Sequence, residues 1–129
     1  SDDGADSWRR VEAGLPSNFG FPMVITARGE LCIAPLDSDE RRYFRDGRFA
    51  IYRSQDEGAS WQAVTSGLPA EPSFVGVLRD AMTTDDAEPT GVYFGTTMGE
   101  CFASRDAGRS FERLPGTLPR VLMMKTVRV

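Results

Sequence analysis

The sequence contains no histidine and only two cysteines, Cys32 and Cys101, among its 129 residues. Without histidine, the usual Ser–His and Cys–His nucleophile pairs cannot form. The two cysteines lie in separate apolar segments, and cysteine is among the residue types most often buried. We therefore expect free, buried thiols and no disulfide framework. We also expect no zinc or copper site and no cofactor, because the sequence has neither histidine nor a cysteine cluster.

Long apolar runs and an excess of positive charge are also missing. No apolar run approaches the roughly 20 residues that cross a bilayer, so we expect no membrane span. The net charge of −4 argues against nucleic acid as a partner, because non-specific binding to phosphates needs a cationic surface. The first residues are polar and acidic and show no signal peptide, so we expect a soluble protein, with the cytoplasm favoured over secretion.

What the sequence does contain is a repeated octet. The pattern Ser-x-Asp-x-Gly-x-Ser-aromatic occurs at residues 54–61 and again, fifty residues later, at residues 104–111. A third, imperfect copy at residues 1–8 has its glycine one place early, at Gly4. A Leu-Pro pair stands fourteen residues after each first serine, at Leu15, Leu68 and Leu118. Self-similarity at this period is typical of propeller blades.

Each residue type in the octet fits a role in a hairpin turn between two strands. Glycine supplies a positive φ, while the aspartate and first serine bond to backbone groups of the turn. The aromatic residue restarts the outgoing strand and fills the gap between sheets. A turn aspartate committed to backbone N–H groups is an ionised acceptor, which argues against a catalytic acid. The positions assigned this structural role are Ser54, Asp56, Gly58, Trp61, Ser104, Asp106, Gly108 and Phe111.

The octet resembles the Asp box, or BNR repeat, of sialidase-like β-propellers and related glycosyl-hydrolase-like proteins. The Gly-Leu-Pro after the octet and the segment 85–96 also look like the connections of that family's blades. Similar boxes occur in sialidases, sorting receptors and photosystem assembly factors, so the resemblance implies a fold more than an activity. Sialidases look like an arginine cluster that grips a carboxylate beside a tyrosine nucleophile, and no position here matches that set residue by residue.

We expect an all-β partial β-propeller of two complete four-stranded antiparallel blades plus one flanking strand at each end. Residues 1–16 would supply the outer strand of a preceding blade, residues 17–69 and 70–117 one blade each, and residues 118–129 the first or closing strand of a further blade. Within these units, the first strand of the second blade is expected at residues 73–78, with residues 79–86 continuing it before the turn. The flanking strands are expected at residues 8–12 and 121–129.

Two blades cannot close a ring, because a propeller typically needs about four to eight. Each blade also buries its faces only against neighbours. We therefore expect the partners to be the remaining blades of a longer chain or copies of itself, and the third alternative is an open stack of two sheets. The isolated chain is then expected not to behave as a clean monomer.

Candidate binding residues lie outside the octets. Arg79 and Asp80 end an apolar segment where adjacent side chains point to opposite faces, so one can reach the channel. Asp80 is the candidate catalytic carboxylate, and a structural ion pair is the alternative. The longest insertion, residues 37–48, carries Arg41, Arg42 and Tyr43, which can stack on a sugar or grip an anion. A solvated loop with its aromatics folded onto the blade is the alternative there, and Arg120 is the last binding candidate.

Three function hypotheses follow. The first is a scaffold that presents loops to a carbohydrate or protein ligand. The second is an exo-glycosidase, in which a complete ring supplies further carboxylates, because glycoside cleavage normally needs two. The third is an assembly factor without ligand chemistry. We expect no catalysis from this chain alone, since two blades lack half of the loops around a channel.

Overall fold

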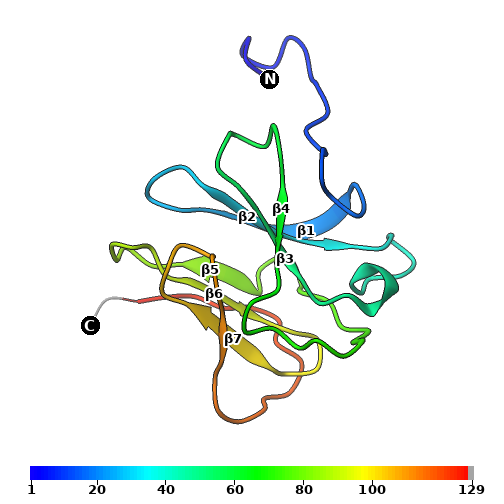
Figure 1. Ribbon diagram of the computed structural model, residues 1–129, viewed down its shortest axis with the longest axis vertical. Helices are drawn as coiled ribbons and strands as arrows, with labels where there is room; N and C mark the ends of the chain where they lie inside the picture. Colours follow the sequence, from blue (N-terminus) through cyan, green and yellow to red (C-terminus); the bar gives the residue numbers. More distant parts are fainter. Residues whose placement is uncertain (128–129) are drawn as a thin grey trace.

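The computed structural model describes residues 1–127 and contains two four-stranded antiparallel sheets, one packed on the other (Figure 1). The first sheet consists of β1 (Phe19–Ile25), β2 (Leu31–Leu36), β3 (Ile51–Ser54) and β4 (Gln62–Val64). The second consists of β5 (Met82–Thr84), β6 (Val92–Gly95), β7 (Cys101–Ser104) and β8 (Glu112–Arg113). In both sheets the strand order follows the chain, which confirms the expected all-β arrangement of two complete blades.

The loop between β2 and β3 contains a short 3₁₀ turn, η1 (Arg45–Gly47). Within residues 1–127, no helix has both the length and the apolarity that a membrane crossing requires.

The hydrophobic core lies between the two sheets. Phe49 bridges them, since its ring centroid lies 5.3 Å from that of Phe102 and 6.1 Å from that of Phe94. Phe94 and Phe102 stack on each other with centroids 5.1 Å apart. Phe44 folds back from the long loop against Phe49 and is buried. Full burial of one such ring contributes about 1.5–3 kcal/mol, so this cluster is the main link between the sheets.

The first strand of the second sheet covers less of the chain than the sequence predicts. The strand is β5, which lies within the predicted continuation at residues 79–86, whereas residues 73–78 form no strand. Val75 and Val77 are nevertheless buried, and the backbone around them bonds to a loop of each sheet. Phe44 N–H, in the β2–β3 loop, donates to Val75 O, and Thr97 N–H, in the β6–β7 turn, donates to Gly76 O. The apolar pattern of this segment therefore reflects burial between two sheets and not membership of a ladder.

The flanking strands expected at the two ends are also absent from the described residues. Residues 8–12 form no strand and pair with no described strand. In the C-terminal segment, Met123 forms an isolated parallel bridge with Asp80, and Met124 N–H donates to Asp80 O. This segment therefore runs alongside β5 without forming a regular strand (Figure 1). Residues 128–129, the last of the expected closing strand, lie outside the described residues.

Candidate functional site

All three octets form the same hydrogen-bonded turn. In the octet 54–61, Ser54 Oγ donates to Asp56 Oδ1 at 2.7 Å and accepts from Gly58 N–H at 2.8 Å. Asp56 also accepts from the Ser60 N–H at 2.9 Å and from the Ser60 hydroxyl at 2.6 Å. The octet 104–111 repeats these four bonds. Every polar group of the motif is thus engaged in holding the turn.

The imperfect N-terminal octet closes in the same way. Ser1 donates to Asp3, Ala5 N–H donates to Ser1 Oγ, and both Ser7 N–H and its hydroxyl donate to Asp3. The displaced glycine is accommodated because both central positions have a positive φ in each octet: 73° and 78° at Gly4 and Ala5, and 56° and 87° at Glu57 and Gly58. The residue at either position can therefore be the glycine.

The octet network predicts acid-sensitive stability. The side-chain hydroxyl and backbone N–H of Ser60 lower the pKa of Asp56 from 3.8 to about 2. A carboxyl whose folded pKa is depressed stabilises the fold above its unfolded pKa, and this contribution is lost as pH falls from about 4 to 2. We expect Asp56→Asn to flatten the decline of the unfolding free energy across this window, measured by urea unfolding at several pH values. An unchanged slope would show that the network does not couple to folding.

The predicted binding residues lie at the ends of the sheets opposite to the octets. In an antiparallel sheet, the turn between β1 and β2 and the octet between β3 and β4 share one end. The long loop between β2 and β3 and the start of β1 lie at the other end. By the same topology, Arg79 precedes β5 at the end of the second sheet that is remote from its octet. The fold therefore separates the octets from the surface where the candidates meet.

Two of the candidate arginines converge on one phenylalanine. The guanidinium carbons of Arg42 and Arg79 each lie 5.2 Å from the centroid of the Phe21 ring. Phe21 in turn packs edge-on against Phe19, with centroids 5.2 Å apart. Both distances lie within the range of cation–π contact, in which a ring face positions the cation. We call Phe21, Arg42 and Arg79 the arginine–phenylalanine cluster.

The two arginines differ in how far their charge is already neutralised. Arg42 makes an ion pair with Asp39, whose backbone carbonyl it also contacts at 2.9 Å. Arg79 is exposed and, within the described residues, forms no hydrogen bond or ion pair. Its guanidinium N–H groups are therefore available to an incoming anion, while the ring holds its plane.

The other predicted residues lie around the cluster or apart from it. Tyr43 follows Arg42 on the long loop. Its ring packs edge-on against that of the exposed Phe74, with centroids 5.2 Å apart. Arg41 makes an ion pair with Asp37. Arg120 is exposed, and no contact among the described residues links it to the cluster. The structure thus brings Arg42 and Arg79 together and leaves Arg41 and Arg120 outside.

Asp80 is exposed, and its backbone carbonyl accepts the N–H of Met124. Its carboxylate makes no hydrogen bond or ion pair within residues 1–127, so the ion pair that was the alternative for this position is not present there. Among the described contacts, Asp39 is the one carboxylate that contacts the arginine–phenylalanine cluster, and Arg42 already binds it. The cluster as it stands is suited to binding an anion.

The roles of the aromatic members of this surface, Phe21 and Phe74, were not predicted from the sequence. The alternation of Phe19 and Phe21 at a strand start was the available signal, because residues two apart share one face of a strand. A charge network was not predicted either: buried Glu30 pairs with buried Arg53 and with the half-exposed Arg109. Nothing in the spacing of these three residues indicates that they meet.

Metal and thiol chemistry find little support among residues 1–127. That part of the chain contains no group of three acidic or cysteine side chains arranged to hold a metal ion. Cys32 is buried and free, and burial raises the pKa of its thiol to about 11, which disfavours the reactive thiolate. Cys101 is also free.

Comparisons with known proteins add no identity to this geometry. No protein-family model matches the chain, and no curated protein matches it significantly.

Proposed function

We propose that this chain is a BNR/Asp-box propeller segment, resembling glycosyl-hydrolase-like proteins, that acts as a carbohydrate- or protein-binding scaffold. The observation that supports the proposal is the arginine–phenylalanine cluster at the ends of the sheets remote from the octets. In this proposal, the octets fix the backbone of each blade, and the loops at the opposite ends of the sheets contact the ligand.

The chemistry of the cluster favours a ligand that bears a carboxylate. Arg79 offers a planar fork of N–H donors that matches a carboxylate, and Phe21 holds the guanidinium beneath it. Phe74 and Tyr43 extend an aromatic surface on which an apolar sugar face or a side chain can pack. Acidic sugars and acidic peptides share this chemistry.

Removal of the Arg79 charge is expected to weaken binding of a carboxylate by about tenfold or more, because a hydrogen bond to a charged group contributes about 1.5–3 kcal/mol. The probes are a glucuronic acid glycoside, its neutral methyl ester and an oligoglutamate peptide, each titrated calorimetrically. Arg79→Gln should lower affinity for an acidic probe and leave the ester unaffected. Arg120→Gln, an exposed arginine outside the cluster, is the matched control.

The pattern of binding distinguishes the ligand sources. Preference for the glucuronide identifies a carbohydrate scaffold, and preference for the peptide identifies a protein scaffold. Absence of binding to both acids, or equal losses in Arg79→Gln and Arg120→Gln, would contradict the proposal and leave an assembly factor without ligand chemistry.

The exposed carboxylate of Asp80 beside Arg79 supports a second candidate, an exo-glycosidase that forms when further blades complete the ring. This candidate requires turnover of aryl glycosides by the completed ring, together with its loss in Asp80→Asn. Glycan binding without turnover would favour the scaffold.

A further inference from the structure

Two of the three octet aromatics dock onto a Leu-Pro turn within the chain. The backbone N–H of Trp61 donates to Ala13 O at 2.9 Å, immediately before the Gly14-Leu15-Pro16 turn. The N–H of Phe111 donates in the same way to Ser66 O at 3.0 Å, immediately before the Gly67-Leu68-Pro69 turn. Each docked aromatic is buried, and Trp61 also donates its indole N–H to Val11 O at 2.8 Å. The contact between an octet and the preceding turn is therefore a repeated joint of this fold.

The third octet and the third turn are each left without such a partner among the described residues. Trp8 is 79% exposed, whereas Trp61 is 7% exposed. Leu118 of the third Leu-Pro turn is 59% exposed, whereas Leu68 is 9% exposed. The chain thus presents an undocked aromatic near one end and an unoccupied turn near the other.

The backbone of the third Leu-Pro segment differs from that of the other two. Thr117 stands at the position that Gly14 and Gly67 occupy in the first two. In the occupied turns, the carbonyl of the docked aromatic covers Gly14 and Gly67. The N–H of Leu118 donates to Gly99 O, whereas the N–H of Leu68 donates within its own turn to Thr65 O. The third segment is therefore held by the turn at Gly99, and within the described residues no octet aromatic docks on it.

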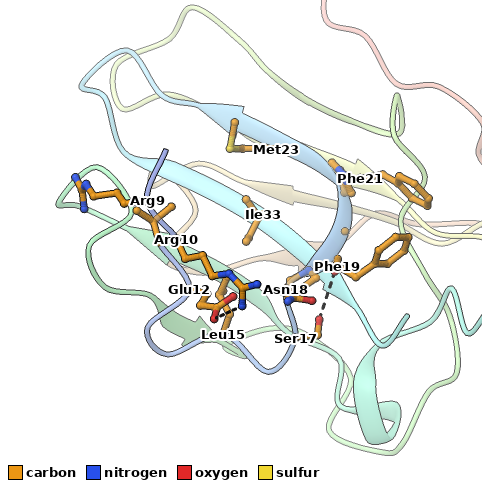
Figure 2. A pocket seen from close by; sticks show the side chains of 14 residues that line it. Arg9, Arg10, Glu12, Leu15, Ser17, Asn18, Phe19, Phe21, Met23 and Ile33 are labelled. Carbon is orange, nitrogen blue, oxygen red and sulfur yellow. Dashed lines mark hydrogen bonds and ion pairs between the residues drawn. The ribbon is translucent and has the colours of Figure 1, made fainter. Parts of the chain in front are cut away.

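One face of the first sheet, bordered by residues 9–12, is also uncovered. Strand pairing places Met23 opposite Ile33 in the first sheet and Met82 opposite Phe94 in the second, at equivalent positions. Met82 is 7% exposed because the first sheet covers it, whereas Met23 is 58% exposed. A groove of about 490 Å³ lies over this face. Figure 2 shows Met23 and Ile33 beside this groove, across from the segment that carries Arg9, Arg10 and Glu12. The face of the first sheet that carries Met23 is therefore exposed, whereas the equivalent face of the second sheet is buried against the first sheet.

The C-terminal end carries apolar surface of its own. Val121 packs against Gly95 on the outer side of the second sheet, where a Cβ on Gly95 would lie 2.5 Å from a Val121 methyl. Beyond it, Leu122, Met123 and Val127 are exposed. These side chains lie next to the third turn, so a molecule that docked an aromatic there would meet them as well.

We propose that a second copy of this chain occupies these surfaces head to tail, with Trp8 of one copy docked on the turn 115–119 of the next. The joint repeats the one that Trp61 and Phe111 make within the chain. The apolar C-terminal segment of one copy then faces the groove over Met23 of the other. Because the two contacting surfaces differ, the contact is heterologous and generates a ring or an open chain of copies. This inference does not depend on the ligand-binding role proposed above.

Sedimentation velocity of the 129-residue chain tests the proposal. The weight-average sedimentation coefficient is expected to rise across micromolar concentrations. Trp8→Ala and Leu118→Asp, both at exposed positions, should each weaken association by about tenfold or more, because a central aromatic commonly dominates an interface. Phe74→Ala, another exposed aromatic remote from both ends, should associate like the unaltered chain.

A mixing experiment identifies the head-to-tail arrangement. Trp8→Ala retains an intact turn, and Leu118→Asp retains an intact Trp8, so an equimolar mixture should form a heterodimer that grows no further. A symmetric contact between two Trp8 residues would give no such complementation. A concentration-independent monomer, variants that associate as the unaltered chain does, or a mixture that stays monomeric would each overturn the proposal.

Discussion

Gly67→Ala is expected to lower the free energy of unfolding by about 2–5 kcal/mol. Gly67 has a φ of +77°, and a Cβ at this position would overlap the backbone carbonyl of Phe111. The left-handed conformation costs a non-glycine residue about 1–2 kcal/mol. Relief of the overlap requires the docked octet to move away, which adds the roughly 1–3 kcal/mol typical of overpacking. Urea unfolding followed by circular dichroism measures the loss.

Gly29→Ala separates the two contributions. Gly29 has a similar φ of +84°, but no atom lies within 4 Å of its Cβ position. We therefore expect this control to lose only the conformational part, about 1–2 kcal/mol. Equal losses in the two variants would show that the joint between Phe111 and the Gly67 turn contributes nothing to stability.

The octet turns could be predicted from sequence because their interactions are local. The first serine, the aspartate and the second serine bond within eight residues, so their spacing alone determines the turn. The N-terminal copy closes despite its shifted glycine, because two adjacent positions share the positive φ. Apolar segments on both sides of each octet then indicated the strands and hence the two antiparallel sheets.

Strand positions could not be predicted from sequence where long-range burial and strand pairing give the same apolar pattern. Val75 and Val77 have the apolar alternation of a strand, yet they lie buried between sheets, and the ladder begins later, at β5. The expected flanking strands failed for a related reason, because strand propensity produces a strand only where a neighbour supplies the ladder hydrogen bonds. Neither distinction is encoded in the residues of the segment itself.

The candidate surface was only half predictable. Arg42 and Arg79 stood out as charged residues in a long loop and at a segment end. Their meeting depends on Phe21, which is distant in sequence and is brought to them by the pairing of β1 with β2 and by the packing of one sheet on the other. The buried pair of Glu30 and Arg53 also depends on the paired strands and on the second octet.

Arg53→Met is expected to lower the free energy of unfolding by about 3 kcal/mol. The guanidinium of Arg53 pairs with Glu30 and donates to Ala107 O in the octet of the other sheet, and both side chains are buried. Removal of one partner from a buried pair costs about 3–5 kcal/mol, because the remaining charge is poorly solvated. Arg109 also reaches Glu30, at 3.3 Å, so we expect the lower end of that range. Methionine keeps the apolar stem and makes the loss electrostatic in origin.

Two comparisons test this origin. Arg113→Met removes an arginine from a more exposed ion pair with Glu100, 3.1 Å apart, and should cost about 0–1 kcal/mol. Glu30→Gln combined with Arg53→Met should be less destabilising than the sum of the two single variants, because the double variant leaves no orphaned charge. Additive losses in urea unfolding would mean that Arg53 stabilises the joint between the sheets through packing and its bond to Ala107, and that the pair with Glu30 contributes little.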